Sequence, residues 1–420
     1  MRKFLFYLFA LGVMLLLIPF GGSAESQENL CLTCHSALKG RLGAPVEKWK
    51  KSIHEKARVF CQDCHGGDPL SLEKAKSPEA GFRGKLRPKE VPLVCGGCHS
   101  NVERMRQYNL RTDQLAEYKT SVHGRRLLED GDERVATCAS CHGAHEVRKK
   151  SDSLSPVFHT NVPETCGKCH ADPELMKPYE LPTDQLRDYR ESYHGQILYG
   201  KIKGKNPLLA PNCATCHGIH GARPPGVKEV VNVCGNCHTV TAAYFKKSPH
   251  YLAVQAMGMP RCVDCHTNHL NKFPTLDMFQ GDSPGHCGSC HSDSSSKGFQ
   301  RAQAIAEDLG KARAGFQRAS SSIQEVKDYG INVDELRERL SRAEKRLVEV
   351  GPITHSLDLA RVKELMKLAE KETSQIVEAS RKVREDVRRR KIAFSIVVVV
   401  IAIIITLLAL KRRALKRALG

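Results

Sequence analysis

Two apolar stretches mark the two ends of the chain. Residues 4–20 read FLFYLFALGVMLLLIPF, follow two basic residues and precede the small residues Gly-Ser-Ala at 22–24. This order predicts a secretory signal peptide over residues 1–24, with an uncleaved membrane anchor as the alternative. Residues 392–410 read IAFSIVVVVIAIIITLLAL and carry no charge. They are long enough to cross a bilayer and therefore predict a single transmembrane helix.

Basic residues flank this predicted transmembrane helix on both sides, at 388–391 and in the basic tail 411–420. An excess of Lys and Arg normally identifies the cytoplasmic side of a membrane segment. With both sides basic, the flanking charges alone give no orientation, and the preceding part of the chain has to supply it.

Residues 297–391 contain no cysteine and show a helical pattern. Their apolar residues recur at intervals of three and four, as in an amphipathic helix: Leu336, Leu340, Ala343, Leu347, Val350, Val362, Leu365, Met366, Ala369 and Ile376. Gly330 and the pair Gly351–Pro352 predict breaks. We expect two or three long helices that form a hairpin or small bundle, and both a solvated stalk and a docking surface fit this pattern.

The region 25–296 is dominated by cysteine. The chain has 18 cysteines, and all of them fall in nine C-x-x-C pairs of uniform spacing: Cys31/Cys34, Cys61/Cys64, Cys95/Cys98, Cys138/Cys141, Cys166/Cys169, Cys213/Cys216, Cys234/Cys237, Cys262/Cys265 and Cys287/Cys290. A histidine follows every second cysteine: His35, His65, His99, His142, His170, His217, His238, His266 and His291.

A zinc ribbon or a redox dithiol would explain C-x-x-C, but neither requires a histidine at the fifth position each time. C-x-x-C-H is the attachment sequence of c-type haem, in which the thiols bond to the vinyl groups and the imidazole is the proximal iron ligand. The sequence therefore predicts nine covalently attached haem c groups. Because c-type haem is attached outside the cytoplasm, we place the haem region in the periplasm and the tail 411–420 in the cytoplasm.

The formal net charge of +19 would suit a nucleic-acid-binding protein. However, each haem carries two propionates, so nine haems offset much of the surplus, and cofactor charge has to be counted. We therefore expect no nucleic acid partner.

The spacing of the motifs also predicts the fold class. Residues 31–291 give each motif only 29 residues (261 divided by 9), which is too little for a separate protein core. We expect a mainly α protein with extensive loops, in which short helices wrap around haems, followed by the long amphipathic helices and one C-terminal transmembrane helix.

An internal repeat divides the haem region into modules. TDQLAEYKTSVHG at 112–124 matches TDQLRDYRESYHG at 183–195, and each leads to two C-x-x-C-H motifs. Further copies begin at WKKSIH (49–54) and YFKKSPH (244–250). The domain 25–296 thus consists of one leading motif, CLTCH, and four two-haem modules.

The remaining histidines are candidates for the sixth, distal iron ligand. Nine lie in the haem region: His54, His123, His145, His159, His194, His220, His250, His269 and His286. There is one such histidine for each motif histidine, and this match favours bis-histidine, low-spin haems. Haems of this kind suit electron transfer because no coordination position is open to substrate. A histidine three residues after its own motif is expected to bind a neighbouring haem. Methionine ligands and purely hydrogen-bonding histidines are the alternatives.

The tenth extra histidine, His355, lies in the helical region. Its Thr and Ser neighbours suit a helix cap, so we expect a surface residue near a helix start.

With its paired C-x-x-C-H motifs, the region 31–291 resembles the multihaem cytochromes c of the cytochrome c3-like group. The resemblance implies electron transfer between the quinone pool and periplasmic acceptors in anaerobic-type respiration. Relatives that oxidise menaquinol have an N-terminal anchor and four haems, whereas this chain has nine motifs and a C-terminal anchor. We therefore expect a membrane partner, such as a b-type cytochrome, besides periplasmic redox proteins.

Three function classes remain after the sequence analysis. The first is an electron-transfer protein of the inner membrane without catalysis of its own, for which no catalytic residue is assigned. The second is an oxidoreductase of the nitrite reductase or hydroxylamine oxidoreductase type, which also places long helices after its haem region. Such an enzyme would keep one haem open to substrate. The third is a helical scaffold that merely holds other cytochromes.

Overall fold

The computed structural model describes residues 29–223 and 232–418. The predicted signal peptide lies outside the described residues. Within the described ranges the chain is 64% helix and has no strand, which confirms the predicted fold class. The chain divides into two compact units, one of residues 1–165 with 220–222 and the other of residues 166–219 with 223–420.

The first unit consists of short helices and 3-10 turns joined by loops. They are α2 (Leu30–Ser36), α3 (Ala44–Trp49), α4 (Ile53–Lys56), α5 (Cys61–His65), η1 (Pro78–Ala80), η2 (Pro88–Glu90), α6 (Val91–His99), α7 (Val102–Arg106), α8 (Gln114–Thr120), α9 (Val122–Leu128) and α10 (Cys138–His142). The division between the units falls within α11 (Val162–His170).

The second unit begins with elements of the same kind. They are α12 (Pro173–Met176), η3 (Lys177–Tyr179), α13 (Gln185–Glu191), α14 (Tyr193–Leu198), η4 (Pro207–Leu209), α15 (Cys213–His217), α17 (Cys234–Cys237), α18 (Thr239–Phe245), α19 (Pro249–Met257), α20 (Cys262–His266), α21 (Asp277–Gln280) and η5 (Cys287–Ser289).

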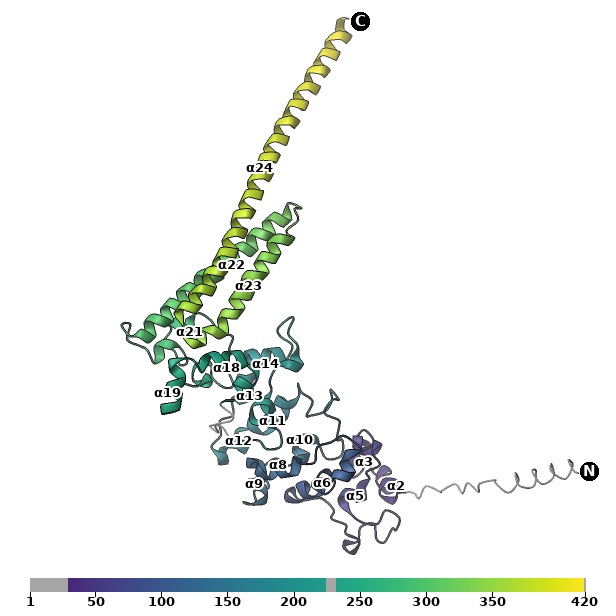
Figure 1. Ribbon diagram of the computed structural model, residues 1–420. Helices are drawn as coiled ribbons and strands as arrows, with labels where there is room; N and C mark the ends of the chain where they lie inside the picture. The colour runs from purple at the N-terminus through teal and green to yellow at the C-terminus, as the bar shows by residue number, and fades with distance from the viewer. Residues whose placement is uncertain (1–28, 224–231, 419–420) are drawn as a thin grey trace, which may run out of the picture. The chain divides into compact units, whose positions relative to one another are not determined.

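Three long helices complete the second unit and form a bundle: α22 (Lys297–Asp328), α23 (Asp334–Ile353) and α24 (Leu359–Ala418), with η6 (Thr354–Ser356) between the last two. In Figure 1, α22 and α23 lie beside the first part of α24, and α24 continues beyond them. The predicted helical bundle is thus confirmed, with three helices.

The apolar pattern of the sequence builds the core of this bundle. One cluster joins Ile305 of α22 to Val350 of α23 and Val362 of α24, and a second cluster joins Val326 to Ile376. Side chains from the preceding region, Tyr244 of α18 and Phe279 of α21, pack against the first cluster. Because α18 also lies against α23 and η6, the bundle is docked on the last part of the haem region rather than free as a solvated stalk.

One predicted break lies at a different position. Gly330, with φ of +76°, does separate α22 from α23. The pair Gly351–Pro352, in contrast, lies in the last turn of α23, and the chain turns only at Leu357, whose φ is +57°. Pro352 has no backbone N–H to donate to the preceding turn, so α23 loses a hydrogen bond there and ends one residue later. The side chain of Asp358 then caps the next helix by accepting from the backbone N–H groups of Ala360 and Arg361.

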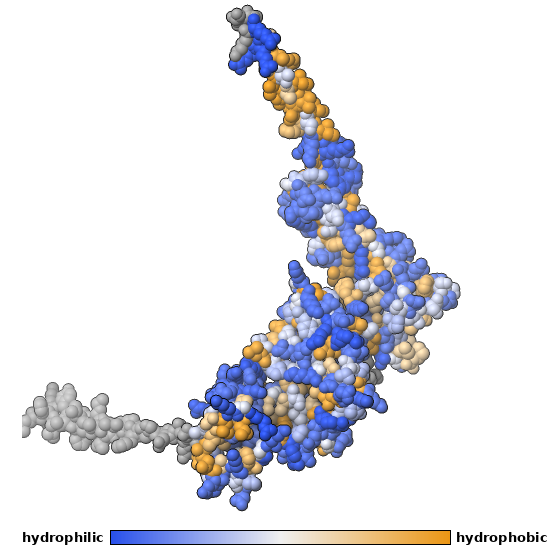
Figure 2. Space-filling model, turned by 180° about the vertical axis from the view of Figure 1, so that it is seen from behind, coloured by the Kyte–Doolittle hydropathy of each residue, from blue (hydrophilic) through white to orange (hydrophobic). Residues whose placement is uncertain are grey.

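Among the described helices, α24 is the one long and apolar enough to cross a membrane. Its residues 392–410 are exposed throughout, so nothing in the protein covers them. In Figure 2 they form an orange apolar band between two blue polar segments. The helix therefore leaves the bundle and continues without interruption into the predicted transmembrane segment.

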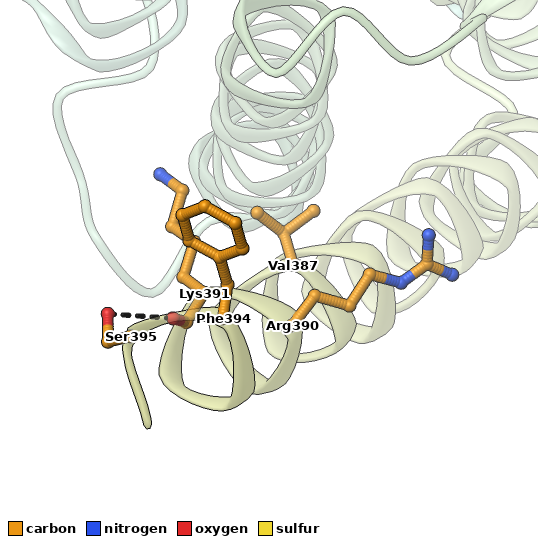
Figure 3. Close-up of a pocket in the computed structure, with 5 residues that line it drawn as sticks. All are labelled: Val387, Arg390, Lys391, Phe394 and Ser395. Atoms are coloured by element: carbon orange, nitrogen blue, oxygen red, sulfur yellow. Dashed lines mark hydrogen bonds between the residues drawn. The ribbon is translucent and has the colours of Figure 1, made fainter. Parts of the chain in front are cut away.

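An open recess of about 430 Å³ lies where α24 leaves the bundle. Figure 3 shows its lining residues, Val387, Arg390, Lys391, Phe394 and Ser395, which all belong to this one helix. The ammonium group of Lys391 lies 5.1 Å from the ring centroid of Tyr329. The recess is a feature of the membrane boundary, and no cysteine or histidine lines it.

The haem region, in contrast, has little protein core. Most buried apolar side chains of the described chain belong to the bundle, and the cluster found among the short helices is small, with Tyr189, Leu198 and Ala210 at its centre. Short helices with so few buried apolar neighbours need another source of apolar contact. This is what a region folded around large flat cofactors would show.

Replacing Val350 with alanine tests the bundle core. Val350 is 1% exposed, whereas Val348 on the same helix is 71% exposed. We expect Val350→Ala to lower the free energy of unfolding by about 1–3 kcal/mol, because two buried methyl groups are lost and a cavity remains. Urea unfolding of the detergent-solubilised chain, followed by circular dichroism, measures this change. Val348→Ala is the matched control, and an equal loss in both variants would contradict the described core.

Candidate haem-binding sites

The first motif of each module forms a five-residue helix with the same local design. In α5, α10, α15 and α20 the residue before the second cysteine accepts a hydrogen bond from the backbone N–H of the residue before the first cysteine. The four bonds are Phe60 N to Asp63 Oδ2 (2.7 Å), Thr137 N to Ser140 Oγ (3.0 Å), Asn212 N to Thr215 Oγ1 (3.1 Å) and Arg261 N to Asp264 Oδ2 (2.6 Å). This contact supports the helix start and fixes the two cysteines one turn apart.

A left-handed residue follows each of these four motifs. Gly66, Gly143, Gly218 and Thr267 have φ values of 71°, 80°, 85° and 59°. Glycine adopts such values without strain, and Thr267 is the exception among the four. The turn takes the chain away from its own motif, so a histidine two residues later faces another part of the unit.

The Ser-x-His sequences that open the modules are helix caps. Ser52, Ser121, Ser192 and Ser248 are 0–2% exposed, and each precedes a short helix: α4, α9, α14 or α19. Their hydroxyl groups accept hydrogen bonds from the backbone N–H groups of His54 (3.1 Å), Gly124 (2.9 Å), Gly195 (3.0 Å) and Tyr251 (3.3 Å). A serine cap of this kind stabilises the helix start and holds the histidine in the first turn.

The repeated glycine after two of these histidines has a steric reason. A Cβ atom on Gly195 would lie 1.8 Å from the carbonyl oxygen of Tyr189, and Gly124 approaches Tyr118 equally closely. The same two tyrosines donate hydrogen bonds of 2.7 Å to the carbonyls of Pro211 and Ala136. The serine, glycine and tyrosine of the repeat are therefore positioning residues. The sequence analysis assigned them no role, although their repetition was the available signal.

The structure places each of seven motif histidines opposite one of seven other histidines. The ring centroids are 5.9–6.3 Å apart, in the pairs His54–His99, His65–His145, His142–His220, His194–His238, His217–His269, His250–His291 and His266–His355. Each pair joins one histidine of a C-x-x-C-H motif to one outside any motif. Both members of each pair belong to the same unit.

This spacing fits two imidazoles on opposite sides of one iron ion. A metal–imidazole bond of about 2 Å plus about 1 Å from nitrogen to ring centre, counted on both sides, gives a centroid separation of about 6 Å. An ordinary aromatic contact could have the same length. It would not select one motif histidine and one other histidine seven times. The described residues thus fit a haem between each pair.

The pairs follow two rules. The histidine that opens a module faces the second motif of the same module, as in His54–His99, His194–His238 and His250–His291. The histidine three residues after a first motif faces the first motif of the preceding module, as in His65–His145, His142–His220 and His217–His269. Each of these three histidines thus lies beside another motif than its own, and the prediction that it binds a neighbouring haem stays a prediction.

Among the described contacts, His35 has no histidine ring facing it. By the second rule its partner would stand at position 68, but that residue is Asp68. Of the remaining candidates, His123 occupies in α9 the position that His194 occupies in α14, and His159 lies shortly before α11. His286 precedes η5, and its buried Nδ1 has no hydrogen-bond partner in the described chain.

The expectation for His355 is wrong. It was predicted to lie on the surface near a helix start, but it lies in η6, half-buried, with its ring 5.9 Å from that of His266. Linear sequence placed it far from every motif. The docking of the bundle on α18 and α21 brings it back to the haem region.

Backbone carbonyls orient several of these imidazoles. The Nδ1–H groups of His35, His65 and His217 donate to the carbonyls of Leu42 (2.9 Å), Gly84 (2.7 Å) and Arg223 (3.4 Å). A proton held on Nδ1 leaves the lone pair of Nε2 free for a metal, which is the usual arrangement of metal-binding histidines. Burial lowers the pKa of other paired histidines, such as His142, His194 and His266, and so favours the neutral form that binds metal.

The cysteines of consecutive motifs lie close together within each unit. Hydrogen bonding to a thiol of the next motif, together with burial, raises the pKa values of three thiols, in the pairs Cys95–Cys138, Cys166–Cys213 and Cys234–Cys262. Burial followed by the neighbouring thiol also raises the pKa values of Cys61, beside Cys31, and of Cys265, beside Cys287, each to about 11. The attachment points of successive motifs are therefore adjacent.

Four second cysteines, Cys34, Cys237, Cys265 and Cys290, are exposed, whereas the other fourteen cysteines are half-buried. Cys98 is half-buried on α6 and contributes to the raised pKa of Cys64, after burial and the charge of Asp63.

The last C-x-x-C-H motif also differs from other motifs in its local backbone. The 3-10 turn η5 ends at Ser289, so that Cys290 follows it, whereas in α5 or α15 the whole motif is helical. The hydroxyl of Ser289 lies 3.9 Å from Sγ of Cys290. Haem attachment at all nine motifs stays a prediction of the C-x-x-C-H sequence.

Haem c, when bound, supplies a one-electron couple at its iron. The residues described above would attach it through paired cysteines, fix both axial imidazoles and leave no coordination position open to substrate where two histidines face each other. Among the described residues, no separate cluster of metal-ligating side chains is present.

Comparison with known families agrees with this geometry. Residues 53–171 match the family model described as cytochrome c3. The matched segment covers most of the first two modules and contains four C-x-x-C-H motifs. It supports the interpretation as a multihaem cytochrome c with covalently bound haem and an electron-transfer function. No curated protein and no solved structure matches the chain.

Replacing His220 with alanine tests the second pairing rule. His220 faces His142 and lies in the first unit, whereas Cys213 and Cys216 belong to the second. We expect His220→Ala to convert one haem to the high-spin ferric form, because the haem of Cys138 and Cys141 loses an axial ligand. Electron paramagnetic resonance of the oxidised protein measures this signal.

The cysteine variants identify which haem has changed. Adding Cys138→Ala and Cys141→Ala should abolish the new high-spin signal, whereas adding Cys213→Ala and Cys216→Ala should leave it in place. The reverse result would assign His220 to its own motif and refute the rule.

Proposed function

We propose that the protein is a membrane-anchored, periplasmic, nine-haem c-type cytochrome that transfers electrons between the membrane quinone pool and periplasmic acceptors. The observation that carries this proposal is the set of seven facing histidine pairs. Two imidazoles per iron leave no position for substrate and suit electron transfer rather than bond-making chemistry.

The arrangement of the attachment sites supports transfer along the chain. Within each unit the thiols of successive motifs touch or interact electrostatically. Examples are Cys31 with Cys61 in the first unit and Cys265 with Cys287 in the second. Haems bound at adjacent thiols would lie near one another in motif order. An electron could therefore enter at one end of a unit and leave at the other.

The membrane helix supports the need for a separate quinone-reactive partner. Residues 392–410 contain no cysteine, histidine, acidic or basic residue. Quinol oxidation releases protons as well as electrons, and intramembrane proton and electron transfer depends on such polar or cofactor-binding side chains. We therefore infer a partner subunit, with a b-type cytochrome as the fitting class, which delivers electrons to the haem region.

The same helix supports the orientation. Haem c is attached outside the cytoplasm, so the haem region lies on the periplasmic side. With a single span, the tail after residue 410 lies in the cytoplasm, and its Lys and Arg residues agree with the usual excess of positive charge on that side.

The proposal is tested by reducing the haems with a quinol in membranes that contain the full chain. We expect the haem absorption to change to the ferrous form after quinol addition and to return after addition of periplasmic extract. A chain that ends before residue 392 should be reduced by quinol at least tenfold more slowly, because it no longer meets its membrane partner.

Chemical reduction by dithionite is the control, since it should reduce both chains equally and show nine haems in each by pyridine haemochrome analysis. Equal quinol reduction of the anchored and truncated chains would contradict the role of the membrane partner. Absence of any quinol-dependent reduction in the full chain would contradict the proposed function.

A second candidate function is an oxidoreductase with one open haem, and one observation favours it. The leading motif, Cys31 to His35, has no facing histidine ring among the described contacts, and Asp68 stands where the pairing rule would supply one. The loop after Asp68 does contact this motif, because the backbone N–H of Leu30 donates to the carbonyl of Pro69 (2.9 Å). Position 68 is therefore near the leading motif but carries a carboxylate.

Replacing Asp68 with histidine distinguishes the two functions. If the leading haem is open, the oxidised protein has one high-spin haem that binds nitrite or hydroxylamine, and Asp68→His should convert it to low spin. Asp68→Asn is the matched control and should leave the signal unchanged. Nine low-spin signals in the unaltered protein would refute the enzyme and leave the electron-transfer function.

A further inference from the structure

We infer that His355 is the distal iron ligand of the haem attached at Cys262 and Cys265, so that the helical bundle itself completes the haem array. This inference rests on the proposed haem-binding function and names a ligand outside the haem region. The first support is geometric. The rings of His266 and His355 have centroids 5.9 Å apart, next to the 6.0–6.3 Å of the other six pairs, and their interplanar angle of 28° lies within the 13–59° of those pairs.

The second support is the orientation of the imidazole. The Nδ1–H of His355 donates to the backbone carbonyl of Gly351 at 3.1 Å. His35, His65 and His217, which are motif histidines, make the same kind of bond. The bond holds the proton on Nδ1 and leaves Nε2 of His355 available to a metal.

The third support is the pairing rule. The first motif of each module faces a histidine from the next module, as His65 faces His145 and His217 faces His269. His266 belongs to the first motif of the last module, and no further module follows it. The rule therefore leaves His266 without a partner from the haem region. His355 takes the position that a next module would have filled.

The fold holds this histidine in place. Thr354 is 8% exposed and donates to the carbonyl of Gly351 (2.6 Å), while the hydroxyl of Ser356 donates to Ile353 (2.7 Å). Val350 and Ile353, on the preceding turn, are each 1% exposed in the first core cluster of the bundle. The short turn η6 is thus fixed on both sides before any cofactor binds, so that little ordering remains to be done at the site.

The consequence is a direct coupling between the haem array and the membrane helix. α24 begins at Leu359, four residues after His355, and runs without interruption into the apolar segment 392–410. Ligation by His355 would bind the start of this helix to the last module. The bundle then supplies an iron ligand to the haem region and does not only support it.

The test is to replace His355 in the full-length, haem-loaded protein purified in detergent. His355→Ala should keep nine haems by pyridine haemochrome analysis while one of the nine becomes high-spin ferric by electron paramagnetic resonance. Added imidazole should restore the low-spin signal. Val348→Ala is the matched control, because it changes an exposed side chain of α23 and removes no imidazole, and it should show no high-spin haem.

A second variant keeps the inference testable where the alanine variant does not assemble. His355→Met retains an axial ligand and should raise the potential of one haem, because methionine ligation favours the ferrous form. A redox titration in which all nine haems keep their potentials, or an alanine variant without a new high-spin signal, would overturn the inference. Neither outcome depends on quinol reduction, so failure of the ligand assignment and failure of the proposed function remain distinct.

Discussion

The structure depends on one constraint: each motif carries only one axial imidazole, and the opposite imidazole has to come from elsewhere in the chain. C-x-x-C-H fixes both thiols and the proximal histidine within five residues, so the local helix cannot also supply the distal ligand. The left-handed residue after each first motif turns the chain away from its own site. Facing pairs such as His142–His220 are the result, and they tie consecutive modules together where a protein core is lacking.

Much of this arrangement could be predicted from the sequence because the chemistry is local. The nine motifs, the module boundaries and the expectation that residues such as His220 lie beside a neighbouring motif follow from spacing alone. The identity of each partner did not, since it depends on which turns the loops make. His286 and His145 were equal candidates by composition, yet His145 faces His65 whereas His286 faces no motif histidine among the described contacts.

His355 shows why tertiary packing was the missing information. In sequence it lies more than fifty residues beyond the last motif, among residues that suit a helix cap. Only the contact of Tyr244 and Phe279 with the core of the bundle brings η6 back to His266. The break at Gly351–Pro352 was misplaced for a related reason. The last turn of α23 is held by the buried side chains of Val350 and Ile353, which outweigh a proline at the helix end.

The two ends of the pairing scheme differ in a way that bears on function. At the last module, the second rule has no further module to draw on, and the bundle supplies His355. At the leading motif, the rule reaches position 68 and finds a carboxylate instead of an imidazole. Asp68 uses its side chain locally, where its Oδ1 accepts from the backbone N–H of Leu70 (2.9 Å). An array of identical modules would have two equal ends. Here one end is closed by a turn that leads into the long apolar helix α24, and the other lacks the rule's histidine, so the two ends of the array are chemically distinct.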